Sequence, residues 1–531
     1  MQSSSAVRRV RWSRPMLSGV CPLAPSSSPF SGASGAARPS ALSSPASWRT
    51  ALLRTASRAT AQSAGYHHSM SPLPQRHIAD GQSISPSASV PAHRLAGIAG
   101  HLASTSSAVA RPLSSSPTTT SSFSSSPSTT PTTPATRRSI HTSSPVMSSQ
   151  PEHATLLIPG PIEFDDAVLN SMSHYSESHV GPSFVSTFGD VLSGLRKLFQ
   201  STDPAAQPFV ISGSGTLGWD LVGANLIEQG DAALVLGTGY FSDGFADALR
   251  VYGADVTELK APVGSRPQLP EIEAALKARK YKLLTVTHVD TSTGVLSELR
   301  NLSELVHRVS PDTLVIVDGV CSVACEEIAF DDWKLDGVVT ASQKAIGVPA
   351  GLSISMFSGR AIKALESRKT PPGSYFASMK NWLPIMRNYE AKKPSYFATP
   401  SPQLVHALHT ALSQILSVPL AERFAKHKAA SDKIKAAVTA LGLKQVASNP
   451  EDQAHGMTAI YLPEGVQIAQ ILPSLSKKNV IFAGGIHKEI ATKYIRFGHM
   501  GVSILEPERG HVDRALKALE EGLSEFGYQK A

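Results

Sequence analysis

The chain has 531 residues, a formal net charge of +8 and a pI of about 9.2, but its charge is unevenly distributed. Residues 1–150 contain thirteen arginines, no lysine and one acidic residue, Asp80, so they carry +12 and leave −4 for residues 151–531. The basic balance therefore belongs to the first 150 residues. A nucleic-acid-binding role for the rest of the chain loses its main support, and an ordinary soluble enzyme is expected there.

The first 150 residues are rich in Ser, Thr, Ala and Pro as well as Arg. An Arg-rich, Ser-rich and acid-poor N-terminus is typical of a mitochondrial transit peptide. The stretch Arg137-Arg138-Ser139-Ile140-His141-Thr142-Ser143-Ser144 resembles a matrix-processing site, so we expect cleavage near it. The alternative is a disordered linker without an address, which residues 112–135 favour. Translation from Met147 would omit this leader and give a cytosolic or peroxisomal product, although the last residues are not a peroxisomal tripeptide signal.

Residues 151–531 are predicted to be soluble and to reside in a reducing compartment. No apolar run approaches the roughly 18 residues that a transmembrane helix needs. Three cysteines, Cys21, Cys321 and Cys325, are too few for a disulfide framework.

Residues 151–410 are predicted to form a large domain with an N-terminal arm at 151–175. Apolar, β-branched runs predict strands at 208–211, 233–236, 256–259, 283–287, 314–317 and 337–340. Helical spacing of apolar residues predicts helices at 183–199, 217–227, 242–252, 271–278 and 299–309. Such alternation predicts an α/β fold with a mostly parallel sheet, covered by helices on both faces.

Residues 411–531 are predicted to form a smaller C-terminal α/β domain. A helix begins before it, with Ser401 as N-cap and Pro402 at the first helical position, and a second helix runs from about Ala421 to near Gly442. Strands are predicted at 458–462, 480–483 and 494–497, and helices at 467–475 and 512–526.

Ligands bind at the carboxyl ends of the strands in sheets of this kind. The residues that follow the predicted strands are Ser214 to Thr216, Tyr240 and Phe241, Asp290 to Thr293, Asp318, and Lys344. These positions are the candidates for a site.

Three of these positions indicate one cofactor. The small-residue turn Ser214-Gly215-Thr216 between a strand and a helix predicts an anion site, because free N–H groups and the helix dipole converge there. Asp318 ends an apolar strand and is costly to keep charged without a cation. Lys344 lies at a strand end, where burial would lower its pKa and make it a nucleophile. A phosphate cradle, an acidic partner for a ring nitrogen and a Schiff-base lysine together predict pyridoxal phosphate. The alternative is three unrelated features, namely a turn, an Asp and a loop lysine.

Five sequence motifs also resemble those of a known family. They are Leu157-Ile158-Pro159-Gly160-Pro161, Ile211-Ser212-Gly213-Ser214-Gly215-Thr216, His288-Val289-Asp290-Thr291-Ser292-Thr293-Gly294, Val317-Asp318-Gly319-Val320 and Ser342-Gln343-Lys344-Ala345-Ile346-Gly347. The chain resembles the class V, fold-type I aminotransferases, and within them the alanine–glyoxylate branch of the fungal kind. The resemblance covers residues 151–528.

The resemblance implies a role for each matching residue. Lys344 would be the Schiff-base lysine and proton shuttle, and Asp318 the partner of the pyridine nitrogen. Phe241 would stack on the ring, where relatives often carry tryptophan, and Tyr240 is its neighbouring alternative. Thr291 would lie near the phenolic oxygen of the cofactor, a role for which Ser292 competes.

The resemblance also implies phosphate, partner and substrate contacts. Ser214, Gly215, Thr216 and Gln343 would bind the phosphate, with Thr216 standing where some relatives carry histidine. Tyr396 and Thr399 would reach the phosphate of a partner subunit, which implies an obligate homodimer.

On the substrate side, Gly160 would contact the substrate and Arg496 would bind its α-carboxylate as a fork. Strand alternation places Arg496 opposite Ile495 and Phe497. His288 and His499 are expected to be hydrogen-bonded structural residues, and Trp219 a core residue.

The expected activity is transfer of an amino group from L-alanine to glyoxylate, giving pyruvate and glycine by a ping-pong mechanism. Serine–glyoxylate and serine–pyruvate transfer are alternatives, because these activities differ by small pocket changes. A cysteine desulfurase or lyase is disfavoured because no cysteine follows Cys325. A non-enzymatic interaction protein is disfavoured by the retained lysine, aspartate and arginine.

Overall fold

The computed structural model describes residues 148–529. The predicted leader, its processing stretch and Met147 lie outside these residues. Among the described helices, none is by itself long and apolar enough to span a membrane, and only the bent pair α9 (Pro402–Ile415) and α10 (Leu420–Ala440) passes that test jointly.

The main element is a seven-stranded sheet with the order β2-β10-β9-β8-β5-β3-β4. Its strands are β2 (Gln207–Ser212), β3 (Ala232–Gly237), β4 (Asp255–Lys260), β5 (Leu283–Thr287), β8 (Leu314–Asp318), β9 (Gly337–Ala341) and β10 (Leu352–Phe357). Only β10 runs antiparallel to its neighbours. The predicted mostly parallel α/β sheet is therefore confirmed, and all six predicted strands are present.

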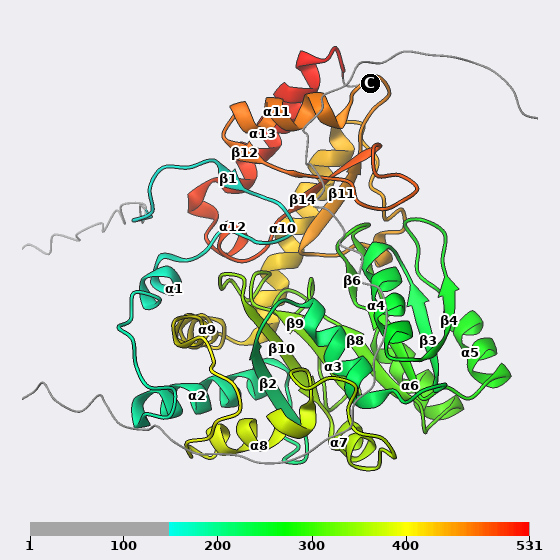
Figure 1. The fold of residues 1–531 in the computed structure, drawn as a ribbon. Helices are drawn as coiled ribbons and strands as arrows, with labels where there is room; N and C mark the ends of the chain where they lie inside the picture. Colours follow the sequence, from blue (N-terminus) through cyan, green and yellow to red (C-terminus); the bar gives the residue numbers. More distant parts are fainter. Residues whose placement is uncertain (1–147, 530–531) are drawn as a thin grey trace, which may run out of the picture. The chain divides into compact units, whose positions relative to one another are not determined.

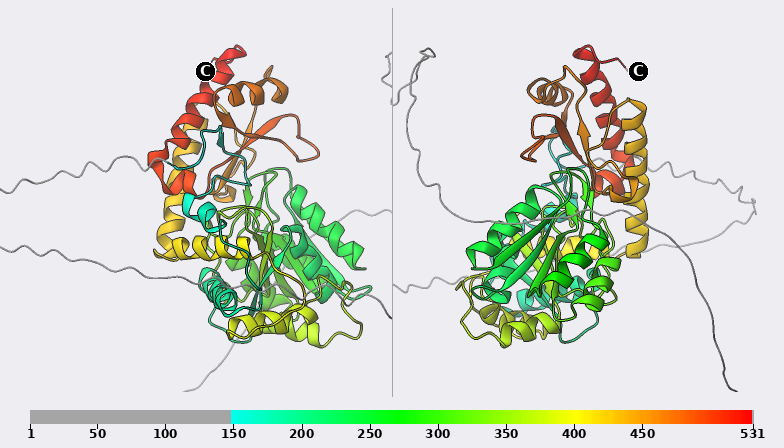
Figure 2. Two further views of the ribbon diagram at one scale, coloured as in Figure 1. Left: turned by 60° about the vertical axis from the view of Figure 1, so that its left-hand side comes forward. Right: turned by 90° about the vertical axis from the view of Figure 1, so that its right-hand side faces the viewer.

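Helices lie on both faces of this sheet (Figures 1 and 2). They are α2 (Pro182–Leu198), α3 (Thr216–Leu226), α4 (Tyr240–Val251), α5 (Leu269–Ala278), α6 (Arg300–Val309), α7 (Gly359–Glu366), α8 (Met379–Glu390) and α9, and the short α1 (Asp166–Ser171) packs on α9. The periodic apolar residues of α2 are buried as predicted, among them Phe184, Phe188 and Leu195. One continuous hydrophobic core joins these helices to the strands.

The C-terminal elements enclose a second hydrophobic core. The antiparallel sheet β11-β14-β13 is built from β11 (Met457–Tyr461), β14 (Tyr494–Gly498) and β13 (Ala483–Gly484). It packs with α10, α11 (Ile468–Lys477) and α13 (His511–Glu525), and the short elements α12 (Val502–Leu505), η1 (Pro450–Asp452) and η2 (Pro507–Arg509) lie in the connections.

The N-terminal arm reaches this second core. Its strand β1 (Thr155–Leu156) pairs in parallel with β12 (Val480–Ile481), and Leu157 is buried among the C-terminal residues. The remaining strands, β6 (Val289–Asp290) and β7 (Val295–Leu296), form a hairpin beside the end of β5. The arm thereby brings Pro159 and Gly160 between the two cores.

The predicted domain limits stay a prediction. The limit between residues 410 and 411 falls inside α9, whose buried side chains all belong to the larger core. The helix α10 begins five residues after α9 ends and contributes Ile434 and Val438 to the second core. Figure 1 shows α10 extending from the level of the sheet to the C-terminal elements.

Candidate active site

Lys344 lies three residues after β9 and is almost fully buried, with 7% of its surface exposed. Its Nζ donates a hydrogen bond to the carbonyl oxygen of Pro159 in the N-terminal arm. Burial disfavours the charged ammonium and lowers the pKa of Lys344, and the nearby Arg496 acts in the same direction. The burial of Lys344 and the direction of its pKa agree with the expectation from sequence, and its catalytic role stays a prediction.

Gly160 packs directly on the stem of this lysine. Its φ is +113°, and a Cβ atom at this position would overlap Lys344, lying 2.7 Å from Cε and 2.9 Å from Nζ. Only glycine fits both the backbone conformation and the space. The structure thus places Gly160 against Lys344, while the implied contact with substrate stays a prediction.

Asp318 ends the neighbouring strand β8 and is 2% exposed. Its Oδ1 accepts a hydrogen bond from the N–H of Val320 at 3.0 Å, and its Oδ2 accepts one from Nε1 of Trp219 at 3.0 Å. Burial raises the pKa of Asp318 to about 6, against the opposing effect of these two donors. A nearby cation would therefore strongly favour the ionised form of this carboxyl group.

Sequence reasoning missed the contact of Trp219 with Asp318. Trp219 was expected in the core, and its ring does stack on Phe245 with centroids 5.5 Å apart. However, its N–H group is directed at the site. The available signal was its position in α3, one helical turn after the predicted phosphate cradle at Thr216.

The predicted phosphate cradle forms the first turn of α3. Ser214 and Thr216 are exposed, and the N–H groups of Ser214, Gly215 and Thr216 donate to no other group within residues 148–529. Gly215 allows this turn to approach the sheet closely, because a Cβ there would lie 2.9 Å from Val320. Free donors at a helix N-terminus can bind a phosphate.

The loop after β5 is held by buried hydrogen bonds. Asp290 accepts from both the N–H and the hydroxyl of Ser292, at 2.9 and 2.5 Å, and that hydroxyl also accepts from the N–H of Tyr240 at 3.0 Å. The Ser292 hydroxyl is thus engaged by both Asp290 and Tyr240. This arrangement favours Thr291 over Ser292 as the residue that faces a bound cofactor.

Arg496 reaches the same loop from β14. Its Nε donates to the carbonyl oxygen of Gly484 at 2.8 Å, and its Nη1 to that of Thr291 at 3.3 Å. The side chain is half-buried, and burial lowers its pKa. Thr291 and Arg496, distant in sequence, are therefore neighbours in the structure.

Two aromatic candidates differ in exposure. Phe241 is half-buried, with its ring 6.5 Å from that of Trp219, whereas Tyr240 is 45% exposed. The neighbourhood of Trp219 and Asp318 supports Phe241 rather than Tyr240 as the ring-stacking residue. Gln343 is half-buried beside Lys344.

Tyr396 and Thr399 lie apart from these residues. Tyr396 is 60% exposed, its hydroxyl is 3.5 Å from that of Thr399, and its ring lies 4.9 Å from that of His179. Within residues 148–529 neither hydrogen-bonds to Lys344 or Asp318. The chain alone does not bring them into the site.

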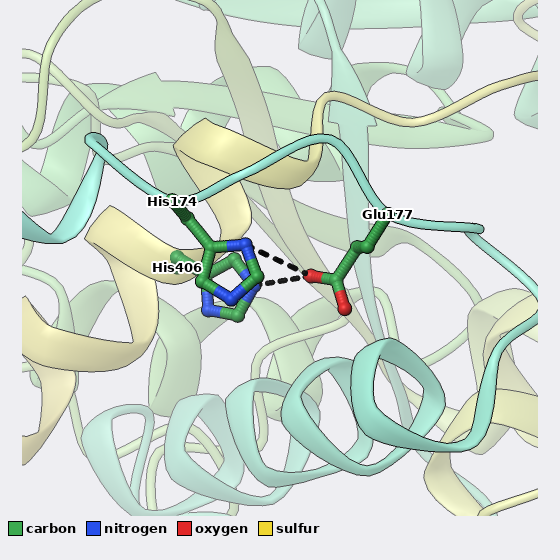
Figure 3. A group of neighbouring side chains, drawn as sticks. All are labelled: His174, Glu177 and His406. Atoms are coloured by element: carbon green, nitrogen blue, oxygen red, sulfur yellow. Dashed lines mark hydrogen bonds and ion pairs between the residues drawn. The ribbon is translucent and has the colours of Figure 1, made fainter. Parts of the chain in front are cut away.

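A cluster of two histidines and a glutamate anchors the segment before α2 on α9 (Figure 3). Glu177 Oε1 lies 2.5 Å from Nε2 of His406 and 3.6 Å from Nδ1 of His174, and the two imidazoles stack with centroids 4.0 Å apart. Nδ1 of His174 also lies 2.8 Å from the carbonyl oxygen of Tyr175, so this nitrogen carries a proton. His174 and His406 thus both interact with one carboxylate. This arrangement is better suited to fixing the segment before α2 on α9 than to binding a metal ion.

The two histidines near the site are neutral. Burial lowers the pKa of His288 to about 4 and that of His499 to about 3. Nε2 of His499 lies 2.8 Å from the hydroxyl of Thr458. Nδ1 of His288 and Nδ1 of His499 have no hydrogen-bond partner in the described part of the chain, so the expected hydrogen bonding is found only at Nε2 of His499.

The chain matches known proteins over most of its described part. Residues 160–501 match the family model Aminotransferase class-V. The chain is 46% identical over 358 residues to alanine–glyoxylate aminotransferase 1 of Saccharomyces cerevisiae, covering 66% of this chain and 92% of that protein. It is 30% identical over 357 residues to a serine–glyoxylate aminotransferase of Methylorubrum extorquens, covering 66% and 87%.

Solved structures agree with this assignment. The chain is 28% identical to an alanine–glyoxylate aminotransferase from Nostoc sp., with a TM-score of 0.65 over 71% of this chain and 97% of that one. A cysteine desulfurase from Thermococcus onnurineus shares the fold, with a TM-score of 0.55, at 14% identity. The predicted fold-type I architecture is thereby confirmed, and the chain belongs to the class V aminotransferases.

Proposed function

We propose that this protein is a pyridoxal-phosphate-dependent transaminase that moves the amino group of L-alanine to glyoxylate, giving pyruvate and glycine by a ping-pong mechanism. The observation that carries the proposal is the placement of Asp318 and Lys344 at the ends of neighbouring strands, with Arg496 held against the carbonyl oxygen of Thr291. The 46% identity to the yeast alanine–glyoxylate aminotransferase supports the choice of donor and acceptor.

The residues present fit the cofactor. The free N–H groups at Ser214 to Thr216 suit its phosphate, and Asp318 suits a protonated ring nitrogen. When bound, pyridoxal phosphate supplies an aldehyde for the lysine and a ring that accepts electrons.

Three side chains of this protein would share the catalytic work. Lys344 has a lowered pKa, so its amine can take a proton from the substrate Cα and return it. Asp318 would keep the proton on the ring nitrogen. The guanidinium of Arg496 is held by the carbonyl oxygens of Gly484 and Thr291, and it would orient the substrate by its α-carboxylate.

A desulfurase activity finds little support in the site. That chemistry needs a reactive thiolate, whereas Cys321 and Cys325 are buried and burial raises the pKa of both thiols. Purified protein should release no sulfide from L-cysteine. Sulfide release at the rate of transamination would contradict the proposal.

Half-reactions with single substrates test the donor and the acceptor. The holoenzyme should react faster with L-alanine than with L-serine, and the aminated enzyme faster with glyoxylate than with pyruvate. A preference for serine would instead support serine–glyoxylate or serine–pyruvate transfer. The same series with Lys344→Ala should show no reaction with any donor.

We also propose that the working form is a homodimer in which Tyr396 and Thr399 complete the site of the partner subunit. The exposure of Tyr396, and that of Tyr375 at 81%, supports a surface that is covered in the assembly.

The proposed location is the mitochondrion, on the composition of residues 1–150. A fluorescent fusion of the full chain should be mitochondrial, and one that starts at Met147 should not. A uniformly cytosolic full-length fusion would contradict the transit-peptide proposal.

A further inference from the structure

Arg423 is a buried arginine whose guanidinium pairs only with backbone carbonyls. It lies in the first turn of α10 and is 7% exposed. Its Nε donates to the carbonyl oxygen of Ala324 at 2.8 Å, and its Nη2 to that of Ala345 at 2.7 Å. Within residues 148–529, no carboxylate lies within ion-pair distance of it. Burying a charge without a counter-ion destabilises the folded protein. The two hydrogen bonds of Arg423 therefore hold the backbone at Ala324 and Ala345 at a cost in stability.

The two loops are those that carry the catalytic candidates. Ala324 belongs to the loop that follows Asp318 at the end of β8. Ala345 is the residue directly after Lys344. One planar guanidinium therefore fixes the backbone beyond both β8 and β9.

His427 lies one helical turn beyond Arg423 and has no exposed surface. Its Nε2 accepts a hydrogen bond from the N–H of Gly501 at 3.2 Å, so the proton is on Nδ1, which donates to the carbonyl oxygen of Arg423 at 2.9 Å. Gly501 comes three residues after β14, the strand of Arg496. The first two turns of α10 thus hold two segments: the loop of Lys344, through Arg423, and the segment after β14, through His427.

We propose that Arg423 and His427 are positioning residues that set the separation between the amine of Lys344 and the guanidinium of Arg496. This inference rests on the proposed transaminase function. Arg496 would hold the α-carboxylate while Lys344 acts on the adjacent carbon, so their separation determines whether the bound substrate is aligned. A misplacement of about 1 Å in such an arrangement can cost about 100-fold in rate.

The test compares a substrate that has a carboxylate with one that lacks it. Holoenzyme carrying Arg423→Met or His427→Leu is reacted with L-alanine and with ethylamine, which has no carboxylate for Arg496. We expect kcat/KM for alanine to fall about 10- to 100-fold and the rate with ethylamine to stay within about 3-fold. Equal losses with both amines would overturn the proposal, because they would indicate a general effect on Lys344 or on the fold.

Two further variants complete the series. Arg423→Lys keeps the charge but can reach only one of the two carbonyl oxygens. Its kcat/KM for alanine should therefore lie between those of Arg423→Met and the unmodified protein. It replaces Arg423→Met in the series if that variant does not fold. Lys426→Met removes an exposed cation from the same turn, where it pairs with Glu422 at 2.9 Å, and should leave both rates unchanged.

Hydrogen exchange separates this proposal from the proposed function. In Arg423→Met the amides of residues 342–348, and in His427→Leu those of residues 501–505, should exchange faster, by about 10-fold, and in Lys426→Met neither segment should change. If the unmodified protein transaminates neither alanine nor serine, the proposed function fails while the exchange result still stands. Unchanged exchange of residues 342–348 in Arg423→Met, or of residues 501–505 in His427→Leu, would overturn the positioning role.

Discussion

Burial acts in opposite directions on the two ionisable residues at the centre of the site. It lowers the pKa of Lys344 and raises that of Asp318 to about 6. A lysine with a lowered pKa gives up its proton more readily and so can act as nucleophile and base, and a carboxylate that lacks a cation favours a ligand that supplies one. Both side chains are thus prepared for a cationic ring that carries an aldehyde.

The glycine beside Lys344 gives the first prediction at the residue scale. Gly160→Ala would place a methyl group onto the lysine stem at a φ of +113°, so we expect activity to fall by about 100-fold or more. Gly465→Ala is the matched control, because its φ is +87° and its Cβ would meet nothing within 4 Å. It should lose stability but keep activity. Equal activity of the two variants would show that the contact with Lys344 is unimportant.

The raised pKa of Asp318 predicts how cofactor binding depends on pH. A protonated ring nitrogen binds the ionised carboxylate, so affinity should rise as the pH increases through about 6 and fall below it. In the cofactor-free protein the sign is reversed, since a buried carboxylate with a raised pKa costs stability as the pH rises above its unfolded value of about 4.

Binding of pyridoxal phosphate at pH 5 and pH 8 measures this dependence. The unmodified protein should bind more weakly at pH 5, and Asp318→Asn should bind weakly at both values. The same pH dependence in Asp318→Asn would contradict the assignment.

At the scale of elements, the cluster of His174, Glu177 and His406 attaches the segment before α2 to α9. The same segment contacts Tyr396 through His179, and Tyr389 donates a hydrogen bond to the carbonyl oxygen of His179 at 2.8 Å. The cluster is therefore placed to stabilise the surface that carries Tyr396.

Replacing the shared carboxylate tests that role. Glu177→Gln should lower the free energy of unfolding by about 1 to 3 kcal/mol, because two half-buried imidazoles lose a charged partner. Glu422→Gln, which breaks an exposed pair with Lys426, should change it by less than about 0.5 kcal/mol. Urea unfolding of the two variants measures both changes. A decrease in the free energy of unfolding of Glu177→Gln no larger than that of Glu422→Gln would contradict the stabilising role of the cluster.

The sequence predicted the elements whose pattern is local. The parallel strands are continuous apolar runs, and α10 ends at Ala440, just before Gly442 in a left-handed conformation. The strand β10 was missed although Leu352–Phe357 alternates apolar residues with serine, because it directly follows a Gly/Pro-rich loop that indicates irregular structure. Its antiparallel place between β2 and β9 depends on tertiary pairing. The helix α8 contains Pro384, which opposes a helix by local rules.

The same distinction holds in the site. Lys344 and Asp318 could be predicted because each depends only on where a strand ends. The fit of Gly160 against Lys344 and the bond from Trp219 to Asp318 depend on how the arm and α3 pack, which no local pattern contains. The partners of Arg423 were missed for the same reason.

At the scale of the whole molecule, the proposed dimer makes each site depend on two chains. Homodimers that carry Lys344→Ala should be nearly inactive, and so should homodimers that carry both Tyr396→Ala and Thr399→Ala. Mixed dimers should regain activity, because one of their two sites then has both the lysine and the partner residues. Mixed dimers without any gain would contradict the shared site.

The most direct test of the account is to locate the cofactor on the chain. Holoenzyme is reduced with borohydride, digested and analysed by mass spectrometry, with and without prior exposure to L-alanine. The account predicts a cofactor adduct on Lys344 alone, and its disappearance after alanine has donated its amino group. An adduct on another lysine, no adduct, or an adduct that alanine does not remove would contradict it.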